Sequence, residues 1–444
     1  MKVPVKLSVR ETLSIYREIL KSGRVTEPIV VEETTKVVVK GFKVLHALQL
    51  LSVEKAPSVL VDLSELKVKP ITVQDLLRAA FIGPKLKEEE FEVTLTREIP
   101  GVSVELEQLT VKQENGRRAL KVFNSTLELL YMGWPTPLVK LNAFSTSSRQ
   151  VWAKLEGCNP FSNSIKDRVG WSMVMRAIEE GNLGEVLYEA TSTNTGIALA
   201  ALANILGLKA KLFVPKTVQK TSEILLRVLG AEVVRLPVSL TVEANEYVGK
   251  LSKEHGAVHL NQFENDANLE VHLKHTAREL DEQLGLLNLR PTCIVGGIGT
   301  SGHMSAISIY FKSKYGGDVR IVGVQPAPNE TIPGIRRRET GMKWVEWSET
   351  EFDEIIDVKL EEAIEGVLSV ARSEGLLIGL SAGAVVHAFK RLSERGEASS
   401  GVYVLVFPDT GYKYVEQFES YFRLKKLEKE GKHETRLVEL VEGE

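Results

Sequence analysis

The chain of 444 residues is longer than one hydrophobic core usually supports, so its length predicts two or three domains. Hydrophobic residues make up 43% of it and charged residues 26%, which describes a soluble globular protein with a large core. A formal net charge of −3 argues against general attraction to nucleic acid or to membrane surfaces.

The cysteines and the apolar runs indicate the cellular compartment in which the protein is expected. Cys158 and Cys293 lie far apart in the sequence, which suggests a reducing compartment and no disulfide framework. Residues 1–7 lack the apolar core and small-residue cleavage site of a signal peptide, and no apolar run reaches the length of a bilayer span. We therefore expect a cytoplasmic protein with neither a membrane nor a nucleic acid as partner.

The first hundred residues form a separable head. Their apolar spacing predicts a helix over 12–21, strands over 28–31 and 37–39, a helix over 44–51 and a strand over 58–62. From about residue 105 the pattern changes to short apolar runs alternating with amphipathic helices, which predicts a mostly parallel sheet with helices on both faces. Strands are expected at 186–189, 212–215, 233–236, 258–260, 293–295, 321–324 and 403–406.

These changes of pattern divide the chain into four parts. We expect a head over 1–100, a connector over 101–132, a catalytic domain over 133–424 and a charged tail over 425–444.

A polar, turn-rich loop at 156–168 feeds Lys166 into the start of a long helical pattern. The helix dipole and burial both disfavour an ammonium there, so the pKa of Lys166 should fall. A lysine with a lowered pKa can form a Schiff base. Taken alone, a first-turn lysine is better explained as a solvated side chain. Cys158, in the same loop, is expected to be a small buried side chain.

Four further loops follow strands or open helices, where open α/β sheets place their ligands. They are residues 189–196, 296–303, 379–384 and 408–414. The hydroxyls and first-turn N–H groups of 189–196 suit a carboxylate or a phosphate, and the glycines of 296–303 let the backbone approach a phosphate. The glycine loop has neither a Walker ending nor Rossmann spacing. Each of the four, taken alone, is explained as a turn and a helix cap.

Together and in this order, the five loops resemble the β family of pyridoxal-phosphate enzymes, which includes cysteine synthases and cystathionine β-synthases. The resemblance covers about residues 130–420. It implies fold type II of these enzymes, with two open, mostly parallel α/β sheet domains and the cofactor between them, here preceded by a small α+β head. It also implies pyridoxal 5′-phosphate as cofactor and a homodimer. His272 and His275 lie on one predicted helix with no acidic motif around them, so no metal site is expected.

The resemblance also assigns residues. Lys166 is implied as the catalytic lysine that forms the Schiff base, Asn194 as the partner of the ring hydroxyl, and Ser381 as the neutral partner of the ring nitrogen. The implied cofactor-binding set is Lys166, Asn194, Gly297, Gly299, Thr300, Ser301, Gly302, His303 and Ser381. The implied substrate-binding set is Thr191, Ser192, Thr193, Thr195, Gln262 and Arg336.

Three residues depart from the common pattern of the family. Thr193 and Ser301 stand where glycines are usual, and His303 replaces a threonine of the phosphate loop. These departures are similar to archaeal O-phosphoserine sulfhydrylases, whose motifs match 159–168, 299–306, 332–344 and 408–414. The first arginine of the third motif binds the substrate phosphate in those enzymes, which implies that role for Arg336. Without the resemblance, Arg336 and its two arginine neighbours are explained as a solvated basic run.

The head resembles the ParB-like fold of archaeal free serine kinases over residues 27–48. Those kinases carry Asp-Gly-His-His-Arg at a turn where this chain has Lys40-Gly41-Phe42-Lys43-Val44. Because the acid and the histidine pair are missing, we expect a non-catalytic binding or docking module.

The sequence therefore predicts a cysteine synthase that converts O-phospho-L-serine and sulfide into L-cysteine and phosphate. Cystathionine β-synthase and O-acetylserine sulfhydrylase activities are the alternatives within the same class. An alternative of another class is a regulator that binds a ligand without turnover, and the presence of Lys166 argues against it.

Overall fold

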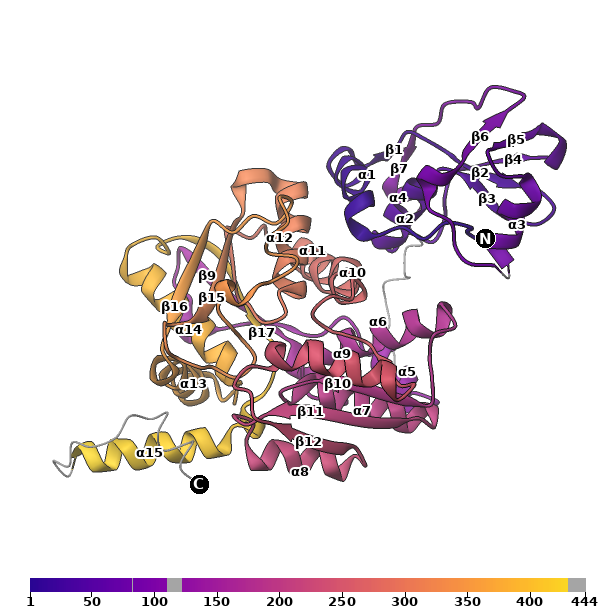
Figure 1. The fold of residues 1–444 in the computed structure, drawn as a ribbon. Helices are drawn as coiled ribbons and strands as arrows, with labels where there is room; N and C mark the ends of the chain where they lie inside the picture. The colour runs from indigo at the N-terminus through magenta and orange to yellow at the C-terminus, as the bar shows by residue number, and fades with distance from the viewer. Residues whose placement is uncertain (82, 110–121, 430–444) are drawn as a thin grey trace. The chain divides into compact units, whose positions relative to one another are not determined.

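The computed structural model describes residues 1–81, 83–109 and 122–429. The chain forms two compact units, Met1–Leu120 with Ser313–Gly316, and Lys121–Lys312 with Gly317–Glu444 (Figure 1). Within the described ranges, no helix is long and apolar enough to cross a membrane.

The first unit mixes short strands with three longer helices. Its helices are α1 (Val9–Ser22), α2 (Phe42–Leu50), α3 (Val73–Phe81) and α4 (Leu106–Leu109). Its strands are β1 (Arg24–Val25), β2 (Ile29–Glu32), β3 (Val38–Lys40), β4 (Ser58–Val61), β5 (Leu66–Lys69), β6 (Glu92–Leu95) and β7 (Val104–Glu105). The predicted helices and strands of the head are confirmed to within a few residues at each end.

Local chemistry sets the ends of α1. Ser8 accepts a hydrogen bond from the N–H of Glu11, whose carboxylate accepts from the N–H of Ser8 in return, and Gly23 ends the helix with a φ of 68°. Strand β2 lies between β3, which is antiparallel to it, and β4, which is parallel. Buried valines of these strands and the apolar face of α3 form the core of this unit.

The second unit contains two sheets. The smaller has the order β12-β11-β10-β13 and is entirely parallel, with β10 (Val186–Ala190), β11 (Lys209–Pro215), β12 (Glu232–Leu236) and β13 (Val258–His259). The larger has the order β16-β15-β14-β17-β9-β8. Its strands are β8 (Leu138–Lys140), β9 (Arg149–Leu155), β14 (Cys293–Gly297), β15 (Arg320–Pro326), β16 (Glu354–Val358) and β17 (Gly401–Phe407), and β8 alone among them is antiparallel to its neighbour.

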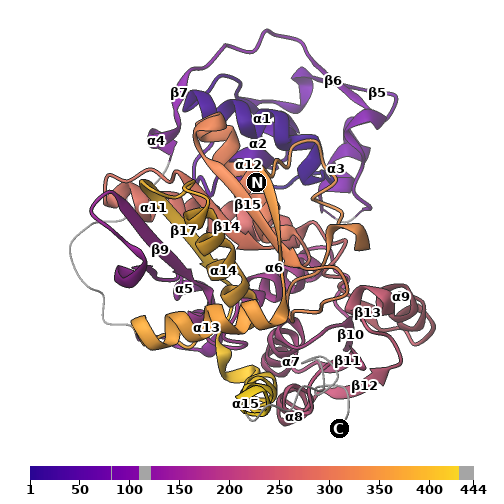
Figure 2. The same cartoon turned by 90° about the vertical axis from the view of Figure 1, so that its left-hand side faces the viewer.

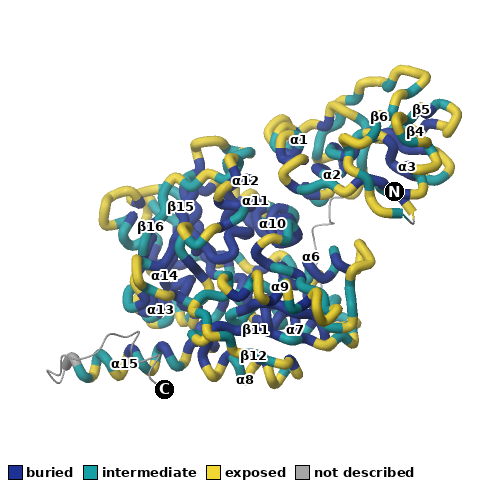
Figure 3. Tube along the Cα trace, in the orientation of Figure 1, coloured by how far each residue is buried: buried dark blue, intermediate teal, exposed yellow. Residues whose placement is uncertain are grey.

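Helices pack around both sheets. They are α5 (Thr126–Met132), α6 (Lys166–Glu179), α7 (Asn194–Leu206), α8 (Lys220–Val228), α9 (Asn245–Glu254), α10 (Ala267–Val271), α11 (Arg278–Leu286), α12 (Gly302–Tyr315), α13 (Leu360–Glu374), α14 (Leu380–Glu394) and α15 (Val415–Lys429). Helices α13 and α14 pack on each other, and α14 contacts the larger sheet (Figure 2). Figure 3 shows that β11 and α14 are largely buried, whereas α8 and α15 are mostly intermediate or exposed.

The predicted strands of this unit are confirmed, and the expectation of open, mostly parallel sheets is met by two separate sheets. Strands β8, β9 and β16 were not among the predicted strands. Cys158 is exposed at the end of a short turn, so the expectation that it is buried is wrong. The connector predicted over 101–132 falls partly on 110–121, and the tail predicted over 425–444 falls largely on 430–444; both stretches lie outside the described residues.

Candidate active site

One cavity of the second unit lies where the loops after β10, β14 and β17 meet the first turns of α6, α7 and α14. The predicted site residues that line it are Lys166, Ser192, Thr193, Asn194, Thr195, Gln262, Gly297, Gly299, Thr300, His303, Arg336 and Ser381. Thr191, Ser301 and Gly302 are buried and do not line it. The fold thus brings together loops that are separated by more than 200 residues.

Lys166 is the first residue of α6 and faces this cavity. Its backbone N–H donates to the hydroxyl of Ser164 at 3.1 Å. Burial lowers the pKa of its ammonium to about 8, and the charge of Asp409 acts in the opposite direction. The expected fall in pKa is confirmed, and burial is its main cause. The unprotonated amine is therefore far more populated near neutral pH than in an ordinary lysine, although the ammonium still predominates.

The loop before α7 is held by its own hydroxyl groups. Thr191 Oγ1 accepts from the N–H of Gly196 at 2.9 Å. Thr195 Oγ1 donates to Gln262 Oε1 at 2.7 Å, and Gln262 Nε2 donates to the carbonyl of Ala190 at 2.8 Å. These contacts fix Gln262 beside the first turn of α7, where N–H groups are available to a carboxylate.

The glycine-rich loop between β14 and α12 leaves little room and several unpaired polar atoms. A Cβ on Gly299 would lie 2.4 Å from the carbonyl oxygen of Gly334, so no side chain fits there. Ser301 has a φ of 76°, and its buried hydroxyl makes no hydrogen bond. Neither ring nitrogen of His303 makes one, and burial lowers the pKa of that imidazole to about 3. His303 is therefore neutral at physiological pH.

Arg336 enters the cavity from the loop after β15. Its Nε donates to the carbonyl of Gly299 at 2.9 Å and its Nη1 to Thr340 Oγ1 at 2.9 Å. The guanidinium carbon lies 5.2 Å from the ring centre of Phe263. Burial lowers the pKa of Arg336 to about 10, so it remains charged at neutral pH.

The model of the pyridoxal-phosphate dependent enzyme family matches residues 129–409 of the chain. The chain belongs to this family. Its cofactor is therefore pyridoxal phosphate.

Relatives of this family member include cysteine synthases. Cysteine synthase B of Pseudomonas aeruginosa is 36% identical over 284 residues, which are 63% of this chain and 93% of that protein. Cysteine synthase B of Escherichia coli is 33% identical over 284 residues, covering 63% and 91%. These matches cover nearly the whole length of both bacterial proteins.

Two solved structures also have a fold similar to that of this chain. O-ureido-L-serine synthase superposes with a TM-score of 0.60 at 26% identity, covering 68% of this chain and 96% of that one. A hydrogen sulfide-producing enzyme from Fusobacterium nucleatum superposes with a TM-score of 0.59 at 29% identity, covering 66% and 100%.

The residues around the cavity fit the cofactor of the family. An aldehyde requires an amine of lowered pKa, which Lys166 provides. A phosphate requires unpaired donors, and the start of α12, the hydroxyl of Ser301 and the imidazole of His303 are available for it. Among the described residues that line the cavity there is no Asp or Glu to repel a phosphate.

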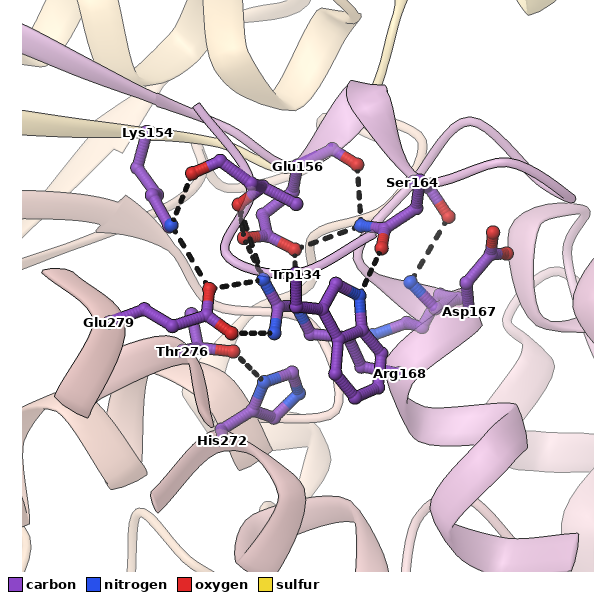
Figure 4. Close-up of polar contacts among 12 residues, drawn as sticks. Trp134, Lys154, Glu156, Ser164, Asp167, Arg168, His272, Thr276 and Glu279 are labelled. Carbon is purple, nitrogen blue, oxygen red and sulfur yellow. Dashed lines mark hydrogen bonds and ion pairs between the residues drawn. The ribbon is translucent and has the colours of Figure 1, made fainter. Parts of the chain in front are cut away.

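Around Arg168, two residues after Lys166 in α6, lies a buried ionic network that sequence analysis missed (Figure 4). Arg168 Nε donates to Glu156 Oε2 at 2.7 Å, and its Nη1 and Nη2 donate to the carboxylate of Glu279 at 2.8 and 2.7 Å. The guanidinium carbon lies 4.6 Å from the ring centre of Trp134, and Lys154 Nζ lies 3.2 Å from Glu279 Oε2. The one signal of this network in the sequence was Arg168 itself, a charged residue at a position of α6 that is buried.

Asp167, the residue before Arg168, binds the loop that precedes α6. Its carboxylate accepts from the N–H groups of Phe161 and Ser162 at 2.7 and 2.8 Å. It thereby closes the loop before the helix. Of the three consecutive residues 166–168, the first faces the cavity and the other two hold the backbone that presents it.

Proposed function

We propose that this chain makes L-cysteine from O-phospho-L-serine and sulfide and releases phosphate. The observation that carries this proposal is the environment of Arg336. It is buried, it lines the cavity, and no described carboxylate forms an ion pair with it. A charged guanidinium in such a place is a binding site for an anion of the substrate.

The next two arginines differ from Arg336 in this respect. Arg337 forms ion pairs with Asp357 and Glu339, and Arg338 pairs with Glu346 at 3.2 Å. Their charges are compensated by neighbouring carboxylates. Arg336 is thus the arginine of this run that remains available to a phosphate dianion.

The rest of the cavity supports an amino-acid substrate. The first turn of α7 with Thr191, Ser192, Thr193 and Thr195 forms the proposed carboxylate site, and Gln262 stands beside it. Asn194 and Ser381 are proposed as partners of the ring hydroxyl and the ring nitrogen of the cofactor. Ser381 is neutral, so the ring stays a mild electron acceptor, which favours β-elimination over transamination.

Lys166 carries the proton transfers of the proposed reaction. The cofactor, when bound, supplies the electron sink that lets the α-carbon of the substrate lose a proton. Lys166 Nζ takes that proton, the bond from the β-carbon to the phosphate oxygen breaks, and Arg336 holds the departing phosphate. Sulfide then forms the new carbon–sulfur bond, and Lys166 returns a proton to the α-carbon. One C–O bond is replaced by one C–S bond without net oxidation.

The names of the relatives support the sulfur chemistry, because two of them are cysteine synthases and one solved structure is described as hydrogen sulfide-producing. O-acetylserine sulfhydrylase and cystathionine β-synthase activities remain the alternatives. A regulator without turnover is disfavoured by the environment of Lys166. We further propose a cytoplasmic homodimer, with a ParB-like head that has no activity of its own.

A comparison of substrates tests the proposal. The full chain loaded with pyridoxal phosphate is given O-phospho-L-serine, O-acetyl-L-serine or L-serine, each with sulfide and, in separate runs, with homocysteine. We expect the highest kcat/KM for phosphoserine with sulfide. Equal or better use of acetylserine would contradict the choice of phosphoserine, and preferred use of homocysteine would favour the alternative.

Substitution of Arg336 extends this comparison. Because a charge-assisted hydrogen bond contributes about 1.5–3 kcal/mol, Arg336→Gln should lower kcat/KM for phosphoserine by about 10-fold to 150-fold. Use of acetylserine should change far less, since its ester is uncharged when bound and the acetate that departs carries one charge, where phosphate carries about two. Arg338→Gln is the matched control, because that side chain is paired with Glu346, and it should leave both substrates unaffected.

A further inference from the structure

Asp409 lies where three of the five loops meet, directly after β17. Its backbone forms an antiparallel bridge with Ser164, and its carbonyl accepts from the N–H of Gly379 at 3.1 Å. Its side chain accepts from Asn194 Nδ2 at 2.8 Å. One residue therefore contacts the loop of Lys166, the helix start that carries Asn194 and the loop that leads to Ser381.

The carboxylate of Asp409 is closely surrounded by the residues around it. It is buried, and its Oδ2 also accepts a hydrogen bond from the hydroxyl of Tyr414. Lys413 Nζ lies 3.8 Å from the same oxygen, whereas Oδ1 makes no hydrogen bond. A Cβ on Gly379 would lie 1.8 Å from Oδ1, so any larger residue there would exclude the carboxylate.

We propose that Asp409 is a positioning residue of the cofactor site, which orients the amide of Asn194 and supplies the negative charge that faces Lys166. With its Nδ2 held by Asp409, Asn194 keeps a buried Oδ1 without a hydrogen bond. The amide is thereby fixed in one orientation before any ligand binds. This inference rests on the role proposed for Lys166 but not on the choice of substrate.

The other titratable groups near Lys166 do not supply that charge. Burial lowers the pKa of His303 to about 3 and that of His272 well below its usual value, so both rings are neutral. Burial raises the pKa of Tyr414 well above its usual value, which keeps its hydroxyl protonated. Lys413 is a cation of the wrong sign. Among the described residues, the anion acting on Lys166 is Asp409.

The charge of Asp409 has a chemical consequence. Burial alone would weaken Lys166 as a base, because it favours the neutral amine. A facing carboxylate partly restores that basicity, so that the same amine can bond an aldehyde and still accept a proton near neutral pH. Asp409 would balance these two demands without touching the substrate.

The titration of Lys166 in Asp409→Asn tests this inference. Lysines of the cofactor-free full chain are methylated with a ¹³C label and followed by NMR across the pH range, and the Lys166 signal is assigned by its absence in Lys166→Arg. Removing a nearby opposite charge should lower the midpoint of Lys166 by about one pH unit. An unchanged midpoint would overturn the inference.

Two further variants test whether a change in the midpoint of Lys166 comes from the lost charge or from a general loss of structure at the site. Lys413→Gln keeps a donor for the carbonyl of Ser162 but removes a cation, so it should move the midpoint of Lys166 upward, opposite to Asp409→Asn. Tyr414→Phe keeps the carboxylate and should leave the midpoint unchanged, whereas a downward move equal to that of Asp409→Asn would contradict the inference. None of these measurements involves substrate, so their failure is distinct from failure of the proposed reaction.

Discussion

At the scale of single residues, Ser301 of the candidate site has an energetically unfavourable conformation. Its φ of 76° lies in the left-handed region, which costs an L-residue about 1 kcal/mol or more. Its hydroxyl is buried without a hydrogen bond, which adds a desolvation cost. The loop proposed to bind the cofactor phosphate thus carries strain at Ser301.

We expect Ser301→Gly to separate stability from cofactor binding. Glycine removes the backbone strain, so the melting temperature of the cofactor-free chain should rise, by an amount equivalent to about 1 kcal/mol. The further rise that pyridoxal phosphate produces should become smaller, because a phosphate donor has been lost. Thermal unfolding with and without cofactor measures both effects.

Ser305→Ala is the control for that experiment. Ser305 is also buried with an unpaired hydroxyl, but it lies inside α12 and has no positive φ. It should reproduce the effect of removing a hydroxyl without the relief of strain. If both variants raise the melting temperature equally, backbone strain at Ser301 is not the cause.

At the scale of elements, the network around Arg168 ties the start of α6 to α11. Burial alone would raise the pKa of Glu279, but the charge and hydrogen bonds of Arg168 hold it at about 2. A carboxyl whose pKa is depressed on folding stabilises the folded state above its unfolded value, here 4.5. That contribution is lost as the pH falls from about 4.5 towards about 2.

Glu279→Gln should therefore destabilise the protein strongly. It leaves Arg168 buried without half of its compensating charge, and breaking a buried pair in this way costs about 3–5 kcal/mol. Unfolding experiments at neutral pH measure the loss, and the variant should lose less further stability than the wild type on acidification. Glu282→Gln in the same helix removes an exposed pair with Arg278 and should cost less than about 1 kcal/mol. Equal losses of stability in the two variants would show that the buried network stabilises the fold no more than an exposed ion pair does.

The elements that sequence analysis found and missed differ in a physical way. Strands such as β10 and β14 are buried on both faces and appear as apolar runs. Strand β16 is an edge strand whose first and fourth residues, Glu354 and Asp357, are charged, so apolar content gives little signal. Strand β9 carries the fully buried Lys154, which tertiary contacts with Glu279 permit.

The same distinction applies to the site. The ordered loops placed Lys166 and Arg336 at one cavity, because strand ends of parallel sheets face the same side. Glu279, one of the two carboxylate partners of Arg168, is 111 residues away in the sequence, and no local pattern identifies it. Asp409 stood in a predicted motif, but its contacts with Asn194 and Gly379 depend on how three loops converge.

At the scale of the whole molecule, the described cavity and the family match both lie in one of the two units. Every described residue that lines the cavity belongs to the second unit, and the family match begins at residue 129. The first unit has its own core of buried apolar residues. Cysteine synthase B of Pseudomonas aeruginosa is covered over 93% of its length by 63% of this chain, so most of that enzyme aligns to little more than half of this one.

We therefore expect a chain that begins at residue 122 to keep its kcat/KM for phosphoserine and its affinity for pyridoxal phosphate. The steady-state rates of the truncated and full chains, compared at equal cofactor occupancy, measure this. A large loss of kcat in a truncated chain that still folds and binds the cofactor would show that the head takes part in catalysis.

The full chain given L-serine and a nucleoside triphosphate tests the head itself. In the proposed likeness to the kinases, Lys40 stands where they carry an aspartate and Phe42 where they carry a histidine, so this turn offers no acid to activate a hydroxyl. No phosphoserine should form. Its formation by the full chain, and its loss in the chain that begins at residue 122, would instead make the head a source of substrate for the cavity that contains Arg336.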